Sequence, residues 1–282
     1  MTSRLTLAAL FAAALITPAA AVAQAQPRAP LVEFEMMTWP EVKDALAAGK
    51  TTALFYTGGT EQRGPQNVNG GHNLMGRVIV RTIAEKLGDA IAMPVLPYTP
   101  NSASATLPGT IGLTPELLKG ILERLSEQSI ATGFKTVVLM GDHGGGQPNV
   151  YADVAKSLTE KYAAQGVKVL YCDAVYSTAN ADFDAYLKAN GFPPSSHAGI
   201  PDTSTMLYLG DGTWVRLDQL PNAVGDPVPT GPRGAAPDPN APPRKNNGIT
   251  GDARKASKEL GKQLFEMKVE YAVKQIKGMT GR

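Results

Sequence analysis

Cysteine is almost absent from this chain of 282 residues, in which Cys172 is the single thiol. No internal disulfide bond can form, so the stability has to come from a packed core, which a chain of this length can build. Neither sign of charge is in large excess: the formal net charge is +2, and no block of lysine or arginine occurs. Nucleic acids and anionic membrane surfaces are therefore poor candidates for partners.

Long apolar runs are missing as well, except at the amino terminus. Arg4 precedes an apolar stretch over 5–16, which ends in small residues near Ala23 and Ala25. This pattern is typical of a secretory signal peptide, and the apolar stretch is too short to span a bilayer. We predict a signal peptide at 1–25, export to the periplasm, and a single mature domain at 26–282 that is free of the membrane.

Apolar runs and helix-like periodicity alternate along the mature chain. Buried strands are expected at 51–56, 90–97, 135–140 and 167–175. Helices are expected from the cap Thr38 to Gly49, at about 73–87, from Thr114 to about 132, and at about 148–164, 181–190 and 251–276. This order predicts an α/β fold, a three-layer α/β/α sandwich with a mainly parallel central sheet. Residues 221–247, rich in proline, glycine and asparagine, are predicted to form a surface arm or an oligomer contact.

Histidine is scarce too, and all three histidines lie in glycine-rich segments that adjoin predicted strands or helices. Glu61 and His72 flank the segment after the first strand, His143 follows the third strand, and His197 precedes a predicted helix. Chemistry in open α/β sheets is placed at the carboxyl ends of strands. Two imidazoles and one carboxylate suit zinc with an open position for water, and they also suit iron(II). The spacing alone fixes no geometry.

The glycine-rich segments carry motifs that resemble the creatininase family of metal-dependent amidohydrolases. The similar segments are GGTEQRGP at 58–65, LPGTIGL at 107–113, GDHGGGQ at 141–147, HAGIPDTS at 197–204 and GITGDARK at 248–255. They follow the family's order, and the resemblance covers about 38–275. It implies a metal-dependent hydrolase that acts on a small molecule, and a homo-oligomer, often a hexamer.

Departures from the family pattern fall on the metal ligands. The resemblance implies two metals, of which one would keep Glu61 and His143 as ligands. His72 stands where the family has a bridging aspartate, Arg63 where it has a histidine, and Gly145 where creatininase has a glutamate. We therefore expect one divalent metal per chain on Glu61, His72 and His143. Zinc is favoured, with iron and manganese as alternatives.

Arg63 and His197 are the candidate catalytic residues. The Arg63 guanidinium can hold a substrate carboxylate or carbonyl oxygen in a fork, or it can form a structural ion pair. His197 matches the family histidine beside the metal-bound water, and is expected to transfer protons. Its segment has Ile200 and Asp202 where the family has glutamates, so the general base stays open.

Four further residues are candidates for the surroundings of the metal or the substrate: Asp142, Asp202, Tyr98 and Ser104. Asp142 either orients a ligand histidine or caps the following helix, while Asp202 or Thr203 is a possible cap of the helix after His197. Tyr98 and Ser104 lie where the family's substrate loop runs.

The leading hypothesis is a hydrolase of a small amide, lactam or related C–N or ester bond, with metal-activated water as the nucleophile. The alternatives are a metal-dependent lyase or other iron or zinc chemistry on the same scaffold, and a non-catalytic ligand-binding protein.

Overall fold

A computed structural model of the chain describes residues 31–101, 107–229 and 244–281, which fall in one compact unit, Leu31–Arg282. The predicted signal peptide, Ser104 and the middle of the predicted arm lie outside the described residues. Among the helices that the structure does describe, none combines the length and apolar character needed to cross a bilayer.

The centre of the unit is a four-stranded sheet in which every neighbouring pair is parallel. The strands are β1 (Thr52–Thr57), β2 (Ala90–Ala92), β3 (Thr136–Gly141) and β4 (Lys168–Tyr171). Their spatial order is β2-β1-β3-β4. All four correspond to predicted strands.

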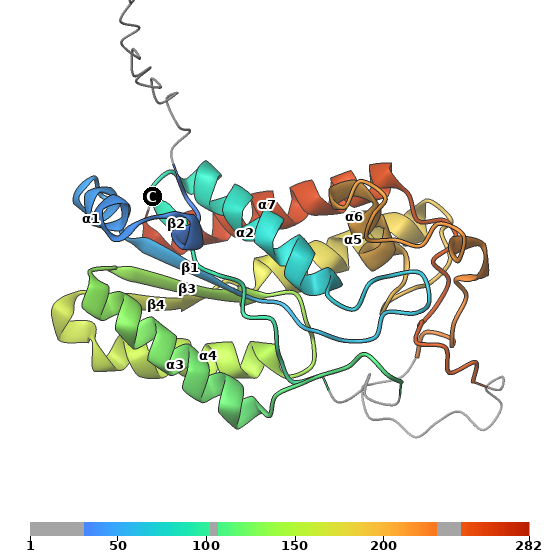
Figure 1. Cartoon of the computed structure of the whole chain (residues 1–282), viewed down its shortest axis with the longest axis horizontal. Helices are drawn as coiled ribbons and strands as arrows, with labels where there is room; N and C mark the ends of the chain where they lie inside the picture. Colours follow the sequence, from blue (N-terminus) through green and yellow to red (C-terminus); the bar gives the residue numbers. More distant parts are fainter. Residues whose placement is uncertain (1–30, 102–106, 230–243, 282) are drawn as a thin grey trace, which may run out of the picture. The chain divides into compact units, whose positions relative to one another are not determined.

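Helices cover both faces of this sheet, as Figure 1 shows. They are α1 (Trp39–Ala47), α2 (Gly71–Leu87), α3 (Pro115–Thr132), α4 (Gln147–Lys161), α5 (Ala179–Ala189), α6 (Ile200–Leu209) and α7 (Lys258–Thr280). Successive side chains of a strand point to opposite faces. Leu54 and Tyr56 accordingly pack in one core with α2 and α7, whereas Ala53 and Phe55 pack in another with α3 and α4. The predicted three-layer α/β/α architecture is confirmed.

Local sequence signals explain where several helices begin. Thr38 and Glu41 form a reciprocal capping box at α1. The Thr114 hydroxyl accepts the Leu117 N–H at the start of α3, and the Ser257 hydroxyl caps α7 in the same way. These side chains satisfy backbone N–H groups that have no partner within the first turn.

The largest differences from the predicted boundaries concern β2, β4 and α7. β2 ends at Ala92 rather than 97 because Pro94 and Pro97 have no N–H to donate to the ladder. β4 ends at Tyr171, where the chain turns into a short π-helical segment, Ala174–Thr178. α7 begins at Lys258 rather than 251, since the residues before it pair with the segment around Val224 and Asp226.

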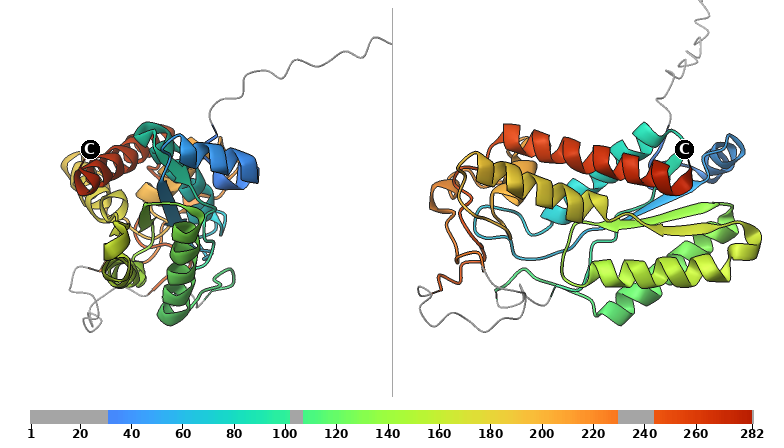
Figure 2. Two further views of the ribbon diagram at one scale, coloured as in Figure 1. Left: turned by 90° about the vertical axis from the view of Figure 1, so that its left-hand side faces the viewer. Right: turned by 180° about the vertical axis from the view of Figure 1, so that it is seen from behind.

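The sheet topology places a crevice between β1 and β3. The chain leaves β1 for α2 on one face, and leaves β3 for α4 on the opposite face (Figure 1). Ligands of open α/β sheets bind at such a switch point, outside the carboxyl ends of the strands. The segments that follow β1 and β3 carry Glu61 and His143. On the α2 side, α7 also packs against α5 and α6 (Figure 2).

Candidate active site

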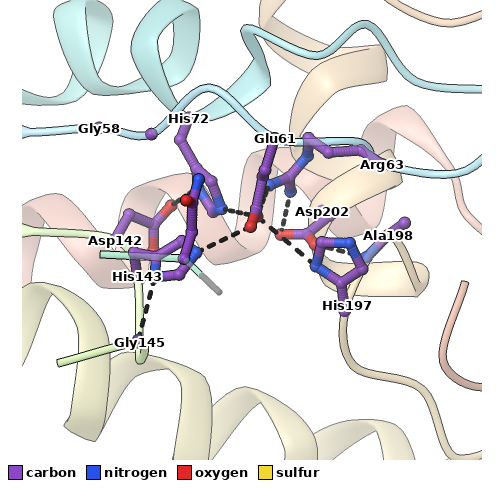
Figure 3. Close-up of polar contacts among 12 residues, drawn as sticks. Gly58, Glu61, Arg63, His72, Asp142, His143, Gly145, His197, Ala198 and Asp202 are labelled. Carbon is purple, nitrogen blue, oxygen red and sulfur yellow. Dashed lines mark hydrogen bonds and ion pairs between the residues drawn. The ribbon is translucent and has the colours of Figure 1, made fainter. Parts of the chain in front are cut away.

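Glu61 is the centre of a buried cluster beyond β1 (Figure 3). Its Oε1 lies 3.0 Å from His72 Nε2, and its Oε2 lies 2.8 Å from His143 Nε2. One ligand atom from each of the three residues lies within 4.8 Å of the others. Burial raises the pKa of Glu61, but the hydrogen bonds from His143 and His72 lower it by more, so the carboxylate stays charged.

Asn73 fixes the segment that carries Glu61. Its side-chain oxygen accepts the Gly59 N–H at 2.9 Å, and its amide donates to the Thr60 hydroxyl at 3.1 Å. A Cβ at position 58 would come within 2.2 Å of the same Asn73 oxygen. Glycine at 58 therefore permits the close approach between this segment and the start of α2.

His72 lies in the first turn of α2, one residue inside the helix, and not in the loop that we predicted. The helix starts earlier because the Gly70 carbonyl already accepts the N–H groups of Asn73 and Leu74. Helix geometry thus orients His72, whose Nδ1 lies 3.6 Å from Asp142 Oδ2. Burial and Arg63 lower the pKa of His72, yet the carboxylates on its two sides raise it by more.

His143 lies in the loop between β3 and α4. Its Nδ1 accepts the Gly145 N–H at 3.0 Å, which places the proton of a neutral ring on Nε2, facing Glu61. A metal at Nε2 needs that proton on Nδ1 instead. Metal binding through Nε2 of the neutral ring and the Gly145 contact therefore exclude each other.

Arg63 is fully buried behind Glu61. Its Nη1 lies 3.2 Å from Glu61 Oε1, and its Nη2 lies 2.7 Å from Asp202 Oδ1. Burial lowers the pKa of the guanidinium, but the carboxylates of Asp202 and Glu61 raise it by more, so it remains a fixed cation. Its side chain does not line the cavity of the site. The structure brings Arg63 to the cluster as a partner of two carboxylates.

Asp202 connects Arg63 to the turn that carries His197. Asp202 lies in the first turn of α6, where Gly199 rather than Asp202 or Thr203 is the N-cap residue, and its Oδ2 accepts the Ala198 N–H at 2.8 Å. Ala198 adopts φ 54°, a left-handed conformation that disfavours residues with a Cβ. The Asp202 contact supports this strained turn.

His197 faces Glu61 with a defined nitrogen. Its Nε2 lies 2.8 Å from the Gln62 carbonyl oxygen and 3.2 Å from the Gln62 side-chain amide nitrogen. The carbonyl contact is the shorter one and needs a donor, so we assign the proton to Nε2. Nδ1 is then the basic nitrogen, and it lies 3.5 Å from Glu61 Oε1. Burial lowers the pKa of this imidazole below its ordinary value, with Glu61 opposing the shift.

A cavity of about 600 Å³ opens beside the cluster. Its walls include Glu61, His72, His143, His197, Asp142 and Asp202. Tyr98 is not among the lining residues and is 39% exposed. The wall also contains polar residues that the motifs did not indicate, namely Asn101, Tyr176, Asn180, Asp184, Ser195, Ser196 and Lys268.

Lys268 carried a sequence signal that was missed. The buried positions of α7 include Leu260, Leu264, Ala272 and Ile276, which are spaced by four or eight residues, and Lys268 continues the series. A lysine on the apolar stripe of a helix is buried at a cost unless a carboxylate meets it. Asp142 provides that carboxylate at 2.6 Å.

The donor atoms could together hold a divalent ion. Glu61, His72 and His143 form the only group of this kind in the part of the chain that the structure describes. Nitrogen and oxygen donors of this set suit zinc, iron or manganese. On its other flank, Glu61 meets the Arg63 guanidinium at 3.2 Å.

Comparison with models of known protein families identifies one family. A family model described as "Creatininase: Creatinine amidohydrolase" matches residues 35–276. No curated protein gives a significant match. A solved structure titled "Creatininase Mn" has a TM-score of 0.69 at 24% identity, and covers 88% of this chain and 98% of its own. A mutant creatininase complexed with creatine has a TM-score of 0.70 at 24% identity, with the same coverage.

A third similar structure is a putative creatinine amidohydrolase from Bacteroides fragilis NCTC 9343. It has a TM-score of 0.69 at 18% identity, and the match covers 90% of this chain and 98% of that one. At these identities, the three structures establish the shared α/β fold.

Proposed function

The chain belongs to the creatininase family, and on that premise we propose that it is a hydrolase of a small amide, lactam or related C–N or ester bond that uses one divalent metal per active site. The observation that carries the proposal is the convergence of Glu61, His72 and His143 at the crevice between β1 and β3. Zinc is the metal that we propose first, because two imidazoles, a carboxylate and an open position suit zinc-dependent hydrolysis.

These three residues would hold the metal, and the other groups of the site would serve the substrate and its protons. A metal bound there would supply Lewis acidity, which activates water and polarises a carbonyl group. Glu61 stays ionised for this task because its pKa is lowered by the two histidines. The cavity beside the cluster has room for a small molecule.

His197 is the proton-transfer residue that we propose. The Gln62 carbonyl holds its Nε2–H and leaves Nδ1 basic, facing Glu61 and the cavity. Nδ1 can take a proton from the attacking water and return it to the leaving nitrogen or oxygen. His197 is thus the general base in this proposal, a role that the sequence analysis left open.

Arg63 has an electrostatic role in this proposal. Because its side chain is fully buried and bound to Glu61 and Asp202, contact with the substrate is not needed for its effect. Its charge compensates the two carboxylates, and through Asp202 it supports the turn of His197. The earlier prediction that Arg63 binds a substrate oxygen would require this pairing to open.

The substrate is proposed by class only. The matching family model is described as creatinine amidohydrolase, and one similar structure is a complex with creatine, so small cyclic amides are the first compounds to assay. Lactones test the ester variant of the same reaction. Export to the periplasm and assembly as a homo-oligomer remain proposals that rest on the sequence.

A pair of alanine variants tests the function. His143→Ala should lose both bound metal and turnover, because it removes one of three ligands. His197→Ala should keep the metal and lose turnover by about 10²–10⁴-fold, the usual contribution of a positioned acid–base group. Unchanged turnover in His143→Ala would refute the metal assignment, and activity that needs iron(II) without water entering the product would favour a lyase or other iron chemistry.

A further inference from the structure

We propose that Lys268, on the last helix of the chain, is a positioning residue of the metal centre: it holds Asp142 in the orientation that fixes the ligand His72. Lys268 Nζ lies 2.6 Å from Asp142 Oδ1 and 3.2 Å from the Val175 carbonyl oxygen. The ammonium group also lies 5.8 Å from the centre of the Tyr176 ring. Lys268 is only 2% exposed, so these contacts replace its hydration.

Asp142 offers its two oxygens to two different partners. Oδ1 meets Lys268, while Oδ2 lies 3.6 Å from His72 Nδ1. That nitrogen is buried and has no hydrogen bond with any residue that the structure describes. The other ring nitrogen, Nε2, faces Glu61 Oε1 at 3.0 Å. Asp142 Oδ2 is therefore placed to accept the Nδ1–H once Nε2 binds a metal.

Such an acceptor matters for a histidine ligand. Ligating histidines give their second N–H to a carboxylate or carbonyl group, which fixes the ring and strengthens the ligand. His72 is held by the backbone of α2 on one side, and Asp142 reaches it from the end of β3. The contact between His72 and Asp142 therefore links the start of α2 to the end of β3.

Lys268 is what keeps Asp142 available as that acceptor. Its ammonium group holds Oδ1 at 2.6 Å inside the protein, where Asp142 is only 5% exposed. Without this buried partner, Oδ1 would be left unpaired and the carboxylate would turn away toward water. That change removes the acceptor from His72, although no metal ligand has been altered.

The position of Lys268 in the sequence supports a role beyond packing. It occupies a buried position of α7, in a series with Leu264 and Ala272, where an apolar residue would pack at a lower cost. The same helix has exposed lysines such as Lys262, which pairs with Glu266 at 3.7 Å. The buried lysine alone reaches the cluster.

The inference rests on the proposed metal site, and the test compares zinc affinities by competition with a chelator. Lys268→Met should weaken zinc binding about 10–100-fold, the usual cost of losing a partner of a metal ligand. Lys268→Arg, which keeps the charge, should recover at least part of this loss. Lys262→Met, the matched control on the same helix, should bind zinc as the unaltered protein does.

A spectroscopic measurement separates positioning from a general loss of stability. In the zinc-loaded protein, the His72 Nδ1–H should give a slowly exchanging, downfield proton resonance, because a carboxylate accepts it. Asp142→Asn should shift this resonance upfield and weaken zinc binding to a similar degree as Lys268→Met. If Lys268→Met does not fold, the Asp142→Asn variant and the resonance of the unaltered protein decide the question.

The outcomes distinguish this inference from the proposed function. If the unaltered protein does not bind zinc, iron or manganese, both fail. If it binds metal, and Lys268→Met or Asp142→Asn binds the metal equally well, only the role of Lys268 is overturned. Absence of the downfield resonance in the zinc-loaded protein would also overturn it.

Discussion

Arg63 Nη1 lies 3.2 Å from Glu61 Oε1, and both side chains are withdrawn from solvent. This contact puts a permanent cation on one flank of the carboxylate whose other flank faces the two histidines. Glu61, Asp142 and Asp202 carry three negative charges, and Arg63 and Lys268 carry two positive ones. For these five groups alone, one divalent ion brings the sum of charges to about +1, and a second ion brings it to about +3. The Arg63–Glu61 contact is therefore one basis of the one-metal proposal.

Replacement of Arg63 should destabilise the protein strongly. Arg63→Met leaves Glu61 and Asp202 without their buried counter-ion, so the free energy of unfolding should fall by about 3–5 kcal/mol. Arg81→Met is the matched control, because Arg81 is 44% exposed and its ion pairs are long; it should change the free energy by less than about 0.5 kcal/mol. Urea unfolding monitored by circular dichroism measures both. Equal stability of the two variants would contradict a buried ion pair at Arg63.

The pH profile should report the basic nitrogen of His197. Because burial lowers its pKa, the ring should remain neutral below the ordinary imidazole value of about 6.5. As the pH falls, kcat/KM should hold until that lowered pKa is reached and only then decline, and His197→Ala should lose this acid limb. The measurement is kcat/KM between about pH 5 and 9 on a hydrolysed cyclic amide or lactone, with metal content checked at each pH. A midpoint above 6.5 at constant metal content would argue against His197 as the base.

Metal binding should release the Gly145 amide. The structure has the Gly145 N–H donating to His143 Nδ1, and a neutral ring that binds metal through Nε2 carries a proton there instead. On addition of zinc, the Gly145 amide proton should shift upfield and exchange faster with solvent, while the amide of Gly88, at the far end of α2, should stay unchanged. Nuclear magnetic resonance of ¹⁵N-labelled protein follows both. An unaffected Gly145 amide in a zinc-loaded protein would show that His143 binds in another way.

The fold and the three candidate ligands could be predicted because their signals are local. Alternating apolar runs and helical periodicity define the layers, and the carboxyl ends of parallel strands must meet at one edge. That rule alone predicts that Glu61, which follows β1, lies near His143, which follows β3, although they are far apart in the sequence. Strand ends were less predictable: Pro94 and Pro97 end the hydrogen-bonded ladder inside an apolar run that otherwise reads as one strand.

Partners from distant segments could not be predicted. Asp202 lies 139 positions after Arg63, and Lys268 lies 126 positions after Asp142, and nothing in their local sequence states which charge they meet. The burial of Lys268 could have been predicted, because this lysine lies within an apolar series. The burial of Arg63 could not, since a loop arginine is exposed in most proteins.

The metal content of the purified protein tests the central claim most directly. Inductively coupled plasma mass spectrometry, after removal of loosely bound ions and reloading with zinc, should give one tightly bound ion per chain. His143→Ala should give none under the same conditions. Two tightly bound ions per chain would contradict the account, which assigns one ion to Glu61, His72 and His143.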